Sequence, residues 1–202
     1  DASTGLVTEN GKPALDFDAT DDLMTATITG MQNFTNLSLF AIIIPDNASQ
    51  ADTTTQIVFG YADSGSNFVN KGLSCGGSTG VVSQETIGLF FSNDTIDSGR
   101  LGSTTYSHSA GEQLLHSQFY LSSGTTLYKN TSEITLNLSF SMSTSTDTSP
   151  SNADIASDAF HISSINGVSA GAAQKVQETI VYNTDQSANR TKIEDNINDY
   201  YD

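Results

Sequence analysis

The residues best suited to catalysis are three histidines and a single cysteine, and their spacing predicts no catalytic centre. None of His108, His116 and His161 has another histidine or cysteine two to four positions away, as zinc sites usually do. We interpret all three as ordinary strand or loop residues. Cys75 in GLSCGG has no second cysteine with which to form an internal disulfide, and we interpret it as a small buried apolar residue. Nothing in these residues supports hydrolysis, and we expect the chain not to be an enzyme.

The charge balance restricts the partners of the chain. Seven lysines and arginines stand against 23 aspartates and glutamates, which gives a formal net charge of −16 and a pI near 4.1. Phosphate backbones would be repelled, so we expect no nucleic-acid partner. The longest apolar run, residues 37–45, is too short to span a bilayer, so we expect no membrane insertion. Because the chain begins DASTGL, we interpret it as a mature product or a piece of a longer protein.

Short apolar runs bounded by Gly, Ser, Asn and Asp predict an all-β domain covering residues 1–202. LSLFAIII, residues 37–44, is almost wholly apolar and predicts a central strand covered on both faces. EITLNLSF, residues 133–140, alternates and predicts one strand with a core face and a solvent face. We interpret GLSCGGSTGV as a flexible connection and residues 141–156 as a long exposed loop. Further strands are expected near residues 12–19, 56–61, 85–92, 112–120, 125–129, 160–165 and 176–182.

The last 27 positions predict a strand, a turn and the only helix, at about residues 186–201. In the strand we expect Val176, Glu178, Ile180 and Tyr182 on one side. Asp185 or Ser187 can cap the helix, and Ile193, Ile197 and Tyr200 or Tyr201 form an apolar stripe. The charged residues are expected in water: Arg190, Lys192, Glu194, Asp195 and Asp199. Such a helix would serve as a lid over a sheet edge or over the mouth of a sandwich.

This closing segment, QETIVYNTDQSANRTKIEDNINDYY, resembles that of concanavalin A-like, laminin-G-like jelly rolls found in virion proteins of marine bacteriophages and in bacterial surface proteins. Four upstream segments resemble the same family in the same order: LDFDATDDLMTA, LSLFAIIIPD, SGTTLYKN and DAFHISSING. The resemblance implies a two-sheet antiparallel β-sandwich with a short C-terminal helix. Some enzymes with this fold, the family 16 glycoside hydrolases, carry an E-x-D-x-E string, which this chain lacks.

Calcium is the cofactor that the resemblance suggests, although none is required. Sandwiches of this kind often hold it with loop carboxylates, and the candidate loops are DATDD and NDTID. Neither has the spaced D-x-[DN]-x-[DN]-G pattern, and turn-forming Asx residues produce the same composition. The candidate ligands are Asp18, Asp21, Asp22, Asn93, Asp94 and Asp97.

Glycan binding is the activity that the resemblance suggests, but sugars are usually held on aromatic platforms and the chain has no tryptophan. Tyr61 and Tyr106 lie in Gly/Ser-rich surroundings and are the candidate platforms, with core packing as the alternative. The function we predict is a non-enzymatic virion module, such as a head-fibre, decoration or tail-fibre domain. It would contact other virion proteins, copies of itself or a host-surface glycan. The alternative is a carbohydrate-binding adhesin module of a bacterial surface or secreted protein, and either role places the chain on a virion surface or outside the cell.

Overall fold

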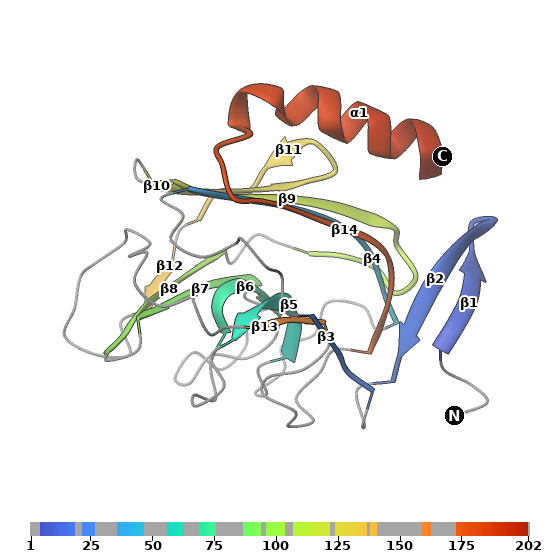
Figure 1. The fold of residues 1–202 in the computed structure, drawn as a ribbon, viewed down its shortest axis with the longest axis horizontal. Coiled ribbons are helices and arrows are strands. Elements are labelled where there is room, and N and C mark those ends of the chain that lie inside the picture. Colours follow the sequence, from blue (N-terminus) through green and yellow to red (C-terminus); the bar gives the residue numbers. More distant parts are fainter. Residues whose placement is uncertain are drawn as a thin grey trace.

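A computed structural model gives the fold of the chain as two facing β-sheets and one C-terminal helix (Figure 1). It describes residues 5–18, 22–26, 36–46, 56–62, 69–75, 87–93, 96–103, 107–121, 124–136, 138–140, 159–162 and 173–201. In 56–62, 69–75, 87–93, 96–103, 138–140 and at position 159, only the backbone is described. The predicted loop at 141–156 lies outside these residues, and the prediction of a single domain over 1–202 stays a prediction.

Each sheet has seven strands, and every pair of neighbours runs antiparallel. The predicted two-sheet sandwich is therefore confirmed. In spatial order, the first sheet contains β1 (Gly5–Glu9), β2 (Lys12–Phe17), β14 (Gln174–Tyr182), β4 (Leu37–Pro45), β9 (Leu114–Leu121), β10 (Gly124–Lys129) and β11 (Ser132–Glu133). The second contains β12 (Leu138–Phe140), β8 (Ile96–Ser103), β7 (Ile87–Asn93), β6 (Val69–Cys75), β5 (Gln56–Ala62), β13 (Ala159–Ile162) and β3 (Met24–Ala26).

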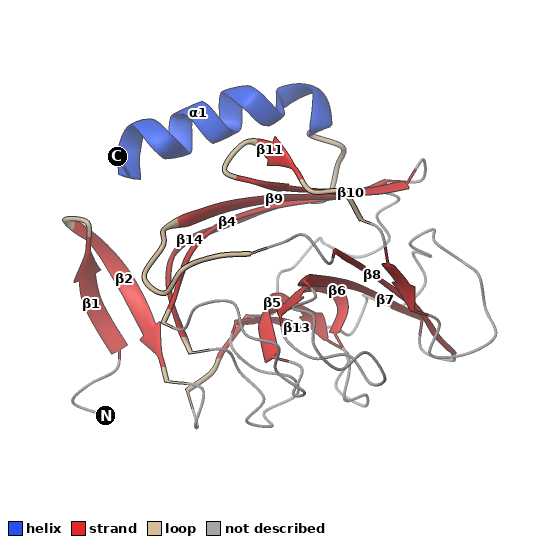
Figure 2. Ribbon diagram, turned by 180° about the vertical axis from the view of Figure 1, so that it is seen from behind, coloured by secondary structure: helices blue, strands red, loops and turns tan. Residues whose placement is uncertain are grey.

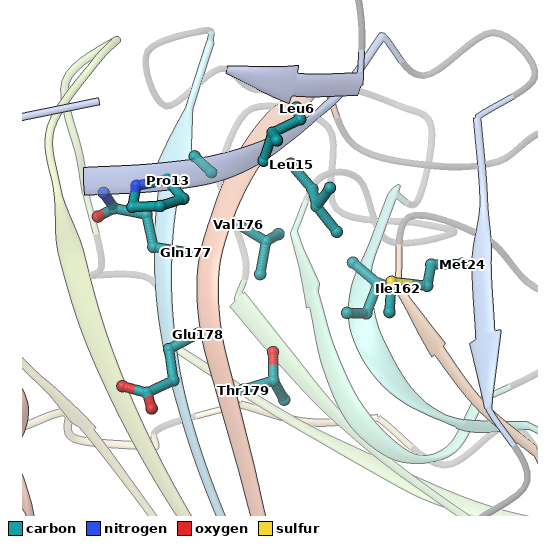
Figure 3. Close-up of a pocket in the computed structure, with 10 residues that line it drawn as sticks. Leu6, Pro13, Leu15, Met24, Ile162, Val176, Gln177, Glu178 and Thr179 are labelled. Atoms are coloured by element: carbon teal, nitrogen blue, oxygen red, sulfur yellow. The ribbon is translucent and has the colours of Figure 1, made fainter. Parts of the chain in front are cut away.

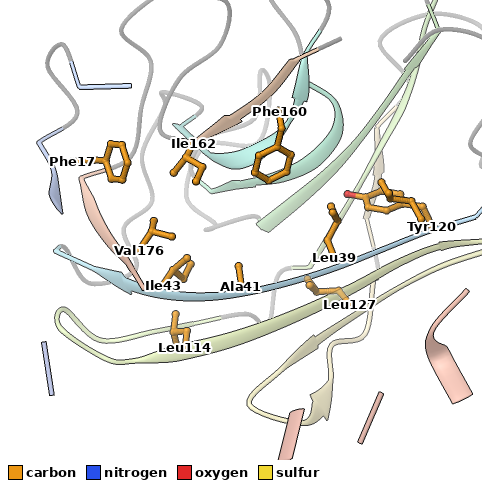
Figure 4. Packing of buried hydrophobic residues seen from close by; sticks show 11 residues of the cluster. Phe17, Leu39, Ala41, Ile43, Leu114, Tyr120, Leu127, Phe160, Ile162 and Val176 are labelled. Carbon is orange, nitrogen blue, oxygen red and sulfur yellow. The ribbon is translucent and has the colours of Figure 1, made fainter. Parts of the chain in front are cut away.

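Strand β4 is the centre of the structure, as its apolar sequence predicts. It lies between β14 and β9, and all its residues except Pro45 are buried. One face, with Leu39 and Ile43, joins the core between the sheets (Figure 4). The other face, with Phe40 and Ile42, packs beneath the helix. A continuous apolar run is required here because both faces of this strand are covered.

The C-terminal helix covers a face of the first sheet, whereas we predicted a lid over an edge or mouth (Figure 2). A 3₁₀ turn, η1 (Ser187–Asn189), leads into α1 (Arg190–Tyr201). Its N-cap is Gln186, which makes no side-chain cap bond, rather than either predicted candidate, whereas Asp185 Oδ1 accepts a hydrogen bond from the Ser187 N–H at 2.8 Å in the turn before it. The predicted stripe is confirmed with Tyr201 as its last member, since Tyr200 is 55% exposed. The helix lies on this face because β4 and β9 present apolar residues there: Phe40, Ile42, Leu115 and Phe119.

Three predictions about strands were wrong. The segment at 133–140 is not one strand, because β11 belongs to the first sheet and β12 to the second, so the chain crosses between sheets at 134–136. Ile134 and Leu136 still pack on the core, so the alternation reflected burial rather than regular pairing. GLSC is not a flexible connection but the end of β6, paired with β5 and β7 on its two sides, since pairing partners decide strand formation more than propensity does.

The third error concerns β14. A β-bulge lies between Val176, which opposes Ile43, and Glu178, which opposes Ile42. The extra residue turns the strand over, so Val176 packs in the core between the sheets while Ile180 and Tyr182 pack beneath the helix. Val176 therefore does not share a face with Glu178, Ile180 and Tyr182.

Candidate functional site

Of the two tyrosines predicted as sugar platforms, the structure describes only the backbone of Tyr61. Tyr61 belongs to β5, where its register partners are Phe160 of β13 and Lys71 of β6. Tyr106 lies outside the described residues. Both assignments stay predictions.

The first candidate calcium loop uses one of its carboxylates in a turn. Asp22 Oδ2 accepts a hydrogen bond from the Asp18 backbone N–H at 3.2 Å, which is the turn-forming role that we weighed against metal binding. Asp21 lies outside the described residues. No group of three or more His, Cys, Asp or Glu residues in the described part of the chain is arranged to hold a metal ion.

The second candidate calcium loop is shorter than its sequence indicates. Asn93 ends β7 and pairs with Ile96 of β8, and Asp97 is already within β8. Asp94 lies outside the described residues, and the structure describes only the backbone at the other two positions. The segment is therefore a tight hairpin, and its role as a calcium site stays a prediction.

An acidic cluster that the sequence did not reveal surrounds Lys175. Its Nζ lies 2.6 Å from Asp46 Oδ1 and 3.7 Å from Glu9 Oε1. Burial raises the pKa of Asp16 in the same cluster, and Lys175 opposes that rise. Residues distant in sequence meet here because β14 lies between β2 and β4. The ammonium of Lys175 is thus the positive charge that faces these carboxylates.

Two of the described histidines, His116 and His161, do not resemble general acids or bases. His116 lies in β9 and His161 in β13, and both are buried. Burial lowers the pKa of His116 to about 3 and also lowers that of His161. A general acid or base works best with a pKa near the operating pH, so neither imidazole is suited to proton transfer at neutral pH.

The chain contains two G-x-S-x-G strings, at 72–76 and 167–171, which in α/β-hydrolases carry the nucleophilic serine. That serine must stand on a sharp turn between a strand and a helix. Ser74 of the first string instead lies within β6 and pairs with neighbouring strands on both sides. The second string lies outside the described residues. The first string therefore lacks the structural context of a nucleophile.

Glu194 is a buried charged residue, a feature typical of functional sites, and its predicted position in solvent was wrong. We predicted it in water, but it is fully buried beneath α1, where Ser117 Oγ donates to its Oε1 at 2.7 Å. Arg190 donates to its other oxygen and stacks over the Tyr128 ring, with 4.0 Å between Cζ and the ring centroid. Ser117 joins Glu194 to β9, and Arg190 pairs with it within the same helix, so the arrangement is structural.

A cleft of about 250 Å³ opens where the β1–β2 hairpin leaves the first sheet (Figure 3). Asn10 and Gly11, both with positive φ, form the two-residue turn of this hairpin, a signal that could have predicted it. Most of the residues that line the cleft are apolar, and three residues of β14 in it are polar. The lining residues are Leu6, Pro13, Ala14 and Leu15 of the hairpin, Met24 and Ile162 of the second sheet, and Val176, Gln177, Glu178 and Thr179 of β14.

Two contacts fix the hairpin beside this cleft, and a third joins the end of α1 to β14. Gln177 Nε2 donates to Glu9 O at 2.9 Å, and the Tyr201 hydroxyl donates to Gln177 O at 3.2 Å. Lys12 Nζ lies 3.9 Å from the centroid of the Tyr200 ring. Gln177 at the bulge, the β1–β2 hairpin and the end of α1 are therefore in contact with one another, and these contacts hold the hairpin in the position that forms one wall of the cleft. With no aromatic wall, it suits an aliphatic group better than a sugar ring.

Comparison with known proteins supports the fold and leaves the family open. No protein-family model matches the sequence, and no curated protein matches it significantly. Trypanosoma rangeli sialidase in complex with the inhibitor DANA is similar over 93% of this chain and 28% of that chain, with 13% identity and a TM-score of 0.58. A mutant of NanB sialidase from Streptococcus pneumoniae is similar over 87% of this chain and 26% of that one, with 14% identity and a TM-score of 0.59.

The chain thus spans about a quarter of the length of these sialidases, and the likeness concerns one β-sandwich portion of larger proteins. At such identities it shows the fold alone. No α-helix in the described residues is long and apolar enough to cross a membrane.

Proposed function

We propose that this chain is a non-enzymatic β-sandwich module that binds carbohydrate on behalf of a larger surface or secreted protein. The observation that carries the proposal is that the structural matches cover most of this chain but only a small part of each matched protein. The fold accounts for 84–93% of this chain in the first five sialidase structures and for only 25–28% of each sialidase. A domain of this proportion is an accessory part of a protein rather than the whole of it.

The non-enzymatic part of the proposal is supported by the described polar residues. The buried carboxylate of Glu194 is occupied by Ser117 and Arg190, and Lys175 is occupied by Asp46. Burial lowers the pKa values of His116 and His161. Glu194 and Lys175 thus have structural partners, whereas a catalytic site requires groups held ready for a substrate.

A virion display module is the second candidate. Its support is the closing segment, which forms a strand, a polar turn and a helix with an apolar stripe, as the resemblance to marine bacteriophage jelly rolls implies. A display module and an adhesin can share one fold, so the two candidates differ in location rather than in architecture. Mass spectrometry of purified particles tests the virion role, and absence of the protein from those particles would refute it.

Carbohydrate binding is tested with the labelled, purified chain on a glycan array that includes sialylated and neutral sugars, in calcium and again in chelator. The expected result is saturable binding that one free sugar competes away. Tyr61→Ala and Tyr106→Ala should each weaken it, whereas Tyr200→Ala, at an exposed helix position, is the matched control. Loss of binding in chelator would support a calcium site. Absence of binding to every sugar would reject the proposal, and release of product from a fluorogenic sialoside would reject its non-enzymatic part.

A further inference from the structure

The outer edge of β14 changes partners at the bulge. Before it, Gln174–Val176 pair with Phe17–Leu15 of β2. After it, residues 178–182 continue to pair with β4 on the inner side, but no described strand pairs with them on the outer side. The part of β2 nearest its hairpin crosses over β14 instead of running alongside it (Figure 3). In an antiparallel strand, alternate residues direct their N–H and C=O groups to opposite neighbours, so part of this edge directs backbone donors and acceptors outward.

Further polar atoms at this edge also lack partners. Gln177 Oε1 and Thr179 Oγ1 are buried, and neither has a hydrogen-bond partner in the described part of the chain. Buried polar groups in proteins are almost always hydrogen-bonded, so unsatisfied ones next to an open strand edge point to a missing partner.

The two faces beside the open edge differ in chemistry. On the side facing the second sheet lies the aliphatic cleft, with Val176 and Thr179 directed into it (Figure 3). Glu178 also lines the cleft, but its half-buried carboxylate points to the opposite side of β14 from Val176 and Thr179 (Figure 3) and has no ion pair or hydrogen bond to the described residues. Burial raises its pKa, and no nearby cation opposes that rise. A strand added beside residues 178–182 would thus direct every second side chain into the cleft and the side chains between them toward the carboxylate of Glu178.

We infer that the β14 edge and its cleft form a docking site for an extended segment of a partner protein in which aliphatic and basic residues alternate. The segment would add a strand beside residues 178–182. Its aliphatic side chains would fill the cleft, and a lysine or arginine would pair with Glu178. Main-chain hydrogen bonds would provide affinity, and the alternation would provide specificity.

Charge and exposure favour this occupant over others. The chain carries a net charge of −16, so a basic segment is attracted, whereas a second copy of this chain is repelled. The rim of the cleft includes Leu6, 78% exposed, and Met24, 43% exposed, with Leu23 at 43% next to it in sequence. Exposed large apolar residues around one cleft mark an interaction surface. The aliphatic walls do not suit a sugar, so this site is separate from the proposed carbohydrate site.

The test uses the full chain and fluorescent, acetylated hexapeptides. The probe alternates valine and lysine. One control has the same composition in two blocks, Val-Val-Val-Lys-Lys-Lys, and another alternates valine and glutamate. We expect the alternating basic peptide to bind at least about tenfold more tightly than the block peptide, because only it can place both side-chain types correctly along one strand. Equal affinity of these two basic peptides would show attraction by net charge alone and would overturn the proposal.

Two variants test the two faces separately. Glu178→Gln should weaken the alternating peptide about fivefold, and Glu133→Gln, at the exposed opposite edge of the same sheet, should not. Met24→Ser, on the exposed rim, should also weaken it several-fold without unfolding the chain. An unchanged affinity in both Glu178→Gln and Met24→Ser would place the peptide elsewhere and overturn the proposal.

Hydrogen exchange provides the readout of strand addition. The outward-directed amides among residues 178–182 should exchange quickly in the free chain and slowly with the alternating peptide bound. If they are already slow in the free monomer, the chain covers its own edge, and if they become slow through dimerisation, a second copy does so. Either result would overturn the proposal. Carbohydrate binding and peptide binding are measured independently, so failure of one leaves the other standing.

Discussion

Ser117 and Glu194, 77 positions apart in sequence, are joined by a 2.7 Å hydrogen bond from Ser117 Oγ to Glu194 Oε1. The bond connects the middle of β9 to the second turn of α1, and both residues are fully buried. Arg190, one helical turn earlier, donates to the second carboxylate oxygen. This carboxylate therefore fixes which turn of the helix lies over the sheet, a specificity that apolar packing alone does not supply.

Replacement of Glu194 is expected to destabilise the fold strongly. Glu194→Ala leaves the Ser117 hydroxyl buried without its acceptor and Arg190 without its counter-charge, so the free energy of unfolding should fall by about 2–4 kcal/mol. Asp195→Ala, at the neighbouring exposed position, should change it by less than about 0.5 kcal/mol. Urea unfolding measures both. Equal losses in the two variants would contradict a specific role for Glu194.

The apolar contacts of the helix should contribute a similar amount. Ile197 is 3% exposed and packs in the cluster that contains Phe40 and Phe119. Ile197→Ala should lower the free energy of unfolding by about 2–4 kcal/mol through lost burial and the cavity left behind. The exposed Asn196→Ala is the control on the same helix. A loss below about 1 kcal/mol would mean that the helix is only loosely attached to the sheet.

The sequence patterns that predicted structure correctly are those that depend on burial. The apolar run of β4 and the stripe of Ile193, Ile197 and Tyr201 are visible because each must face apolar neighbours. Alternation misled at 133–140 because Ile134 and Leu136 face the core while the chain passes from one sheet to the other. A periodic pattern reports which side chains are buried, and it does not report which strand pairs with which.

The candidate site could not be predicted because it depends on pairing. The bulge at Gln177 has no sequence signature, yet it exposes the edge of β14 and turns over the face of every later residue in that strand. The burial of Glu194 was equally hidden, since its partners Ser117 and Arg190 are polar and look like surface residues in the sequence. Only the Asn10–Gly11 turn carried a local signal, and it marks one wall of the cleft.

Lys175 should stabilise the fold until strongly alkaline pH. The hydrogen bond to Asp46 is the main cause of its raised pKa, and burial opposes it. A raised lysine pKa contributes stability that is fully present below the ordinary value of 10.5 and is lost as pH rises through the folded value. Because the Lys175 and Asp46 side chains are 21% and 34% exposed, we expect Lys175→Gln to cost less than about 1 kcal/mol at neutral pH.

The measurement for Lys175 is urea unfolding of the wild type and Lys175→Gln at about pH 9 and about pH 11.5, on either side of the lysine titration. The stability difference between the two proteins should shrink at the higher pH. The exposed Lys192→Gln is the matched control, with little difference from wild type at either pH. A difference that stays constant across this range would show that Lys175 acts through packing rather than charge.

His116 should make the fold sensitive to mild acid. Burial lowers its pKa to about 3, with the charges of His108 and Lys129 acting in the same direction. The unfolded chain takes up a proton near the ordinary histidine pKa of 6.5, while the folded chain does not until near pH 3. Stability from the neutral imidazole is therefore present above 6.5 and falls as pH decreases toward 3, by up to about 1.4 kcal/mol per pH unit.

The decisive window for His116 lies between about pH 6.5 and about pH 5, above the titration of ordinary carboxylates. Urea unfolding across it should show a steeper loss of stability for the wild type than for His116→Gln, whose amide cannot take up a proton. His108→Gln, in a partly exposed position of the preceding loop, should leave most of the wild-type slope intact. Equal slopes for the wild type and His116→Gln would mean that the folded state accepts the proton, which contradicts the burial of this imidazole between the sheets.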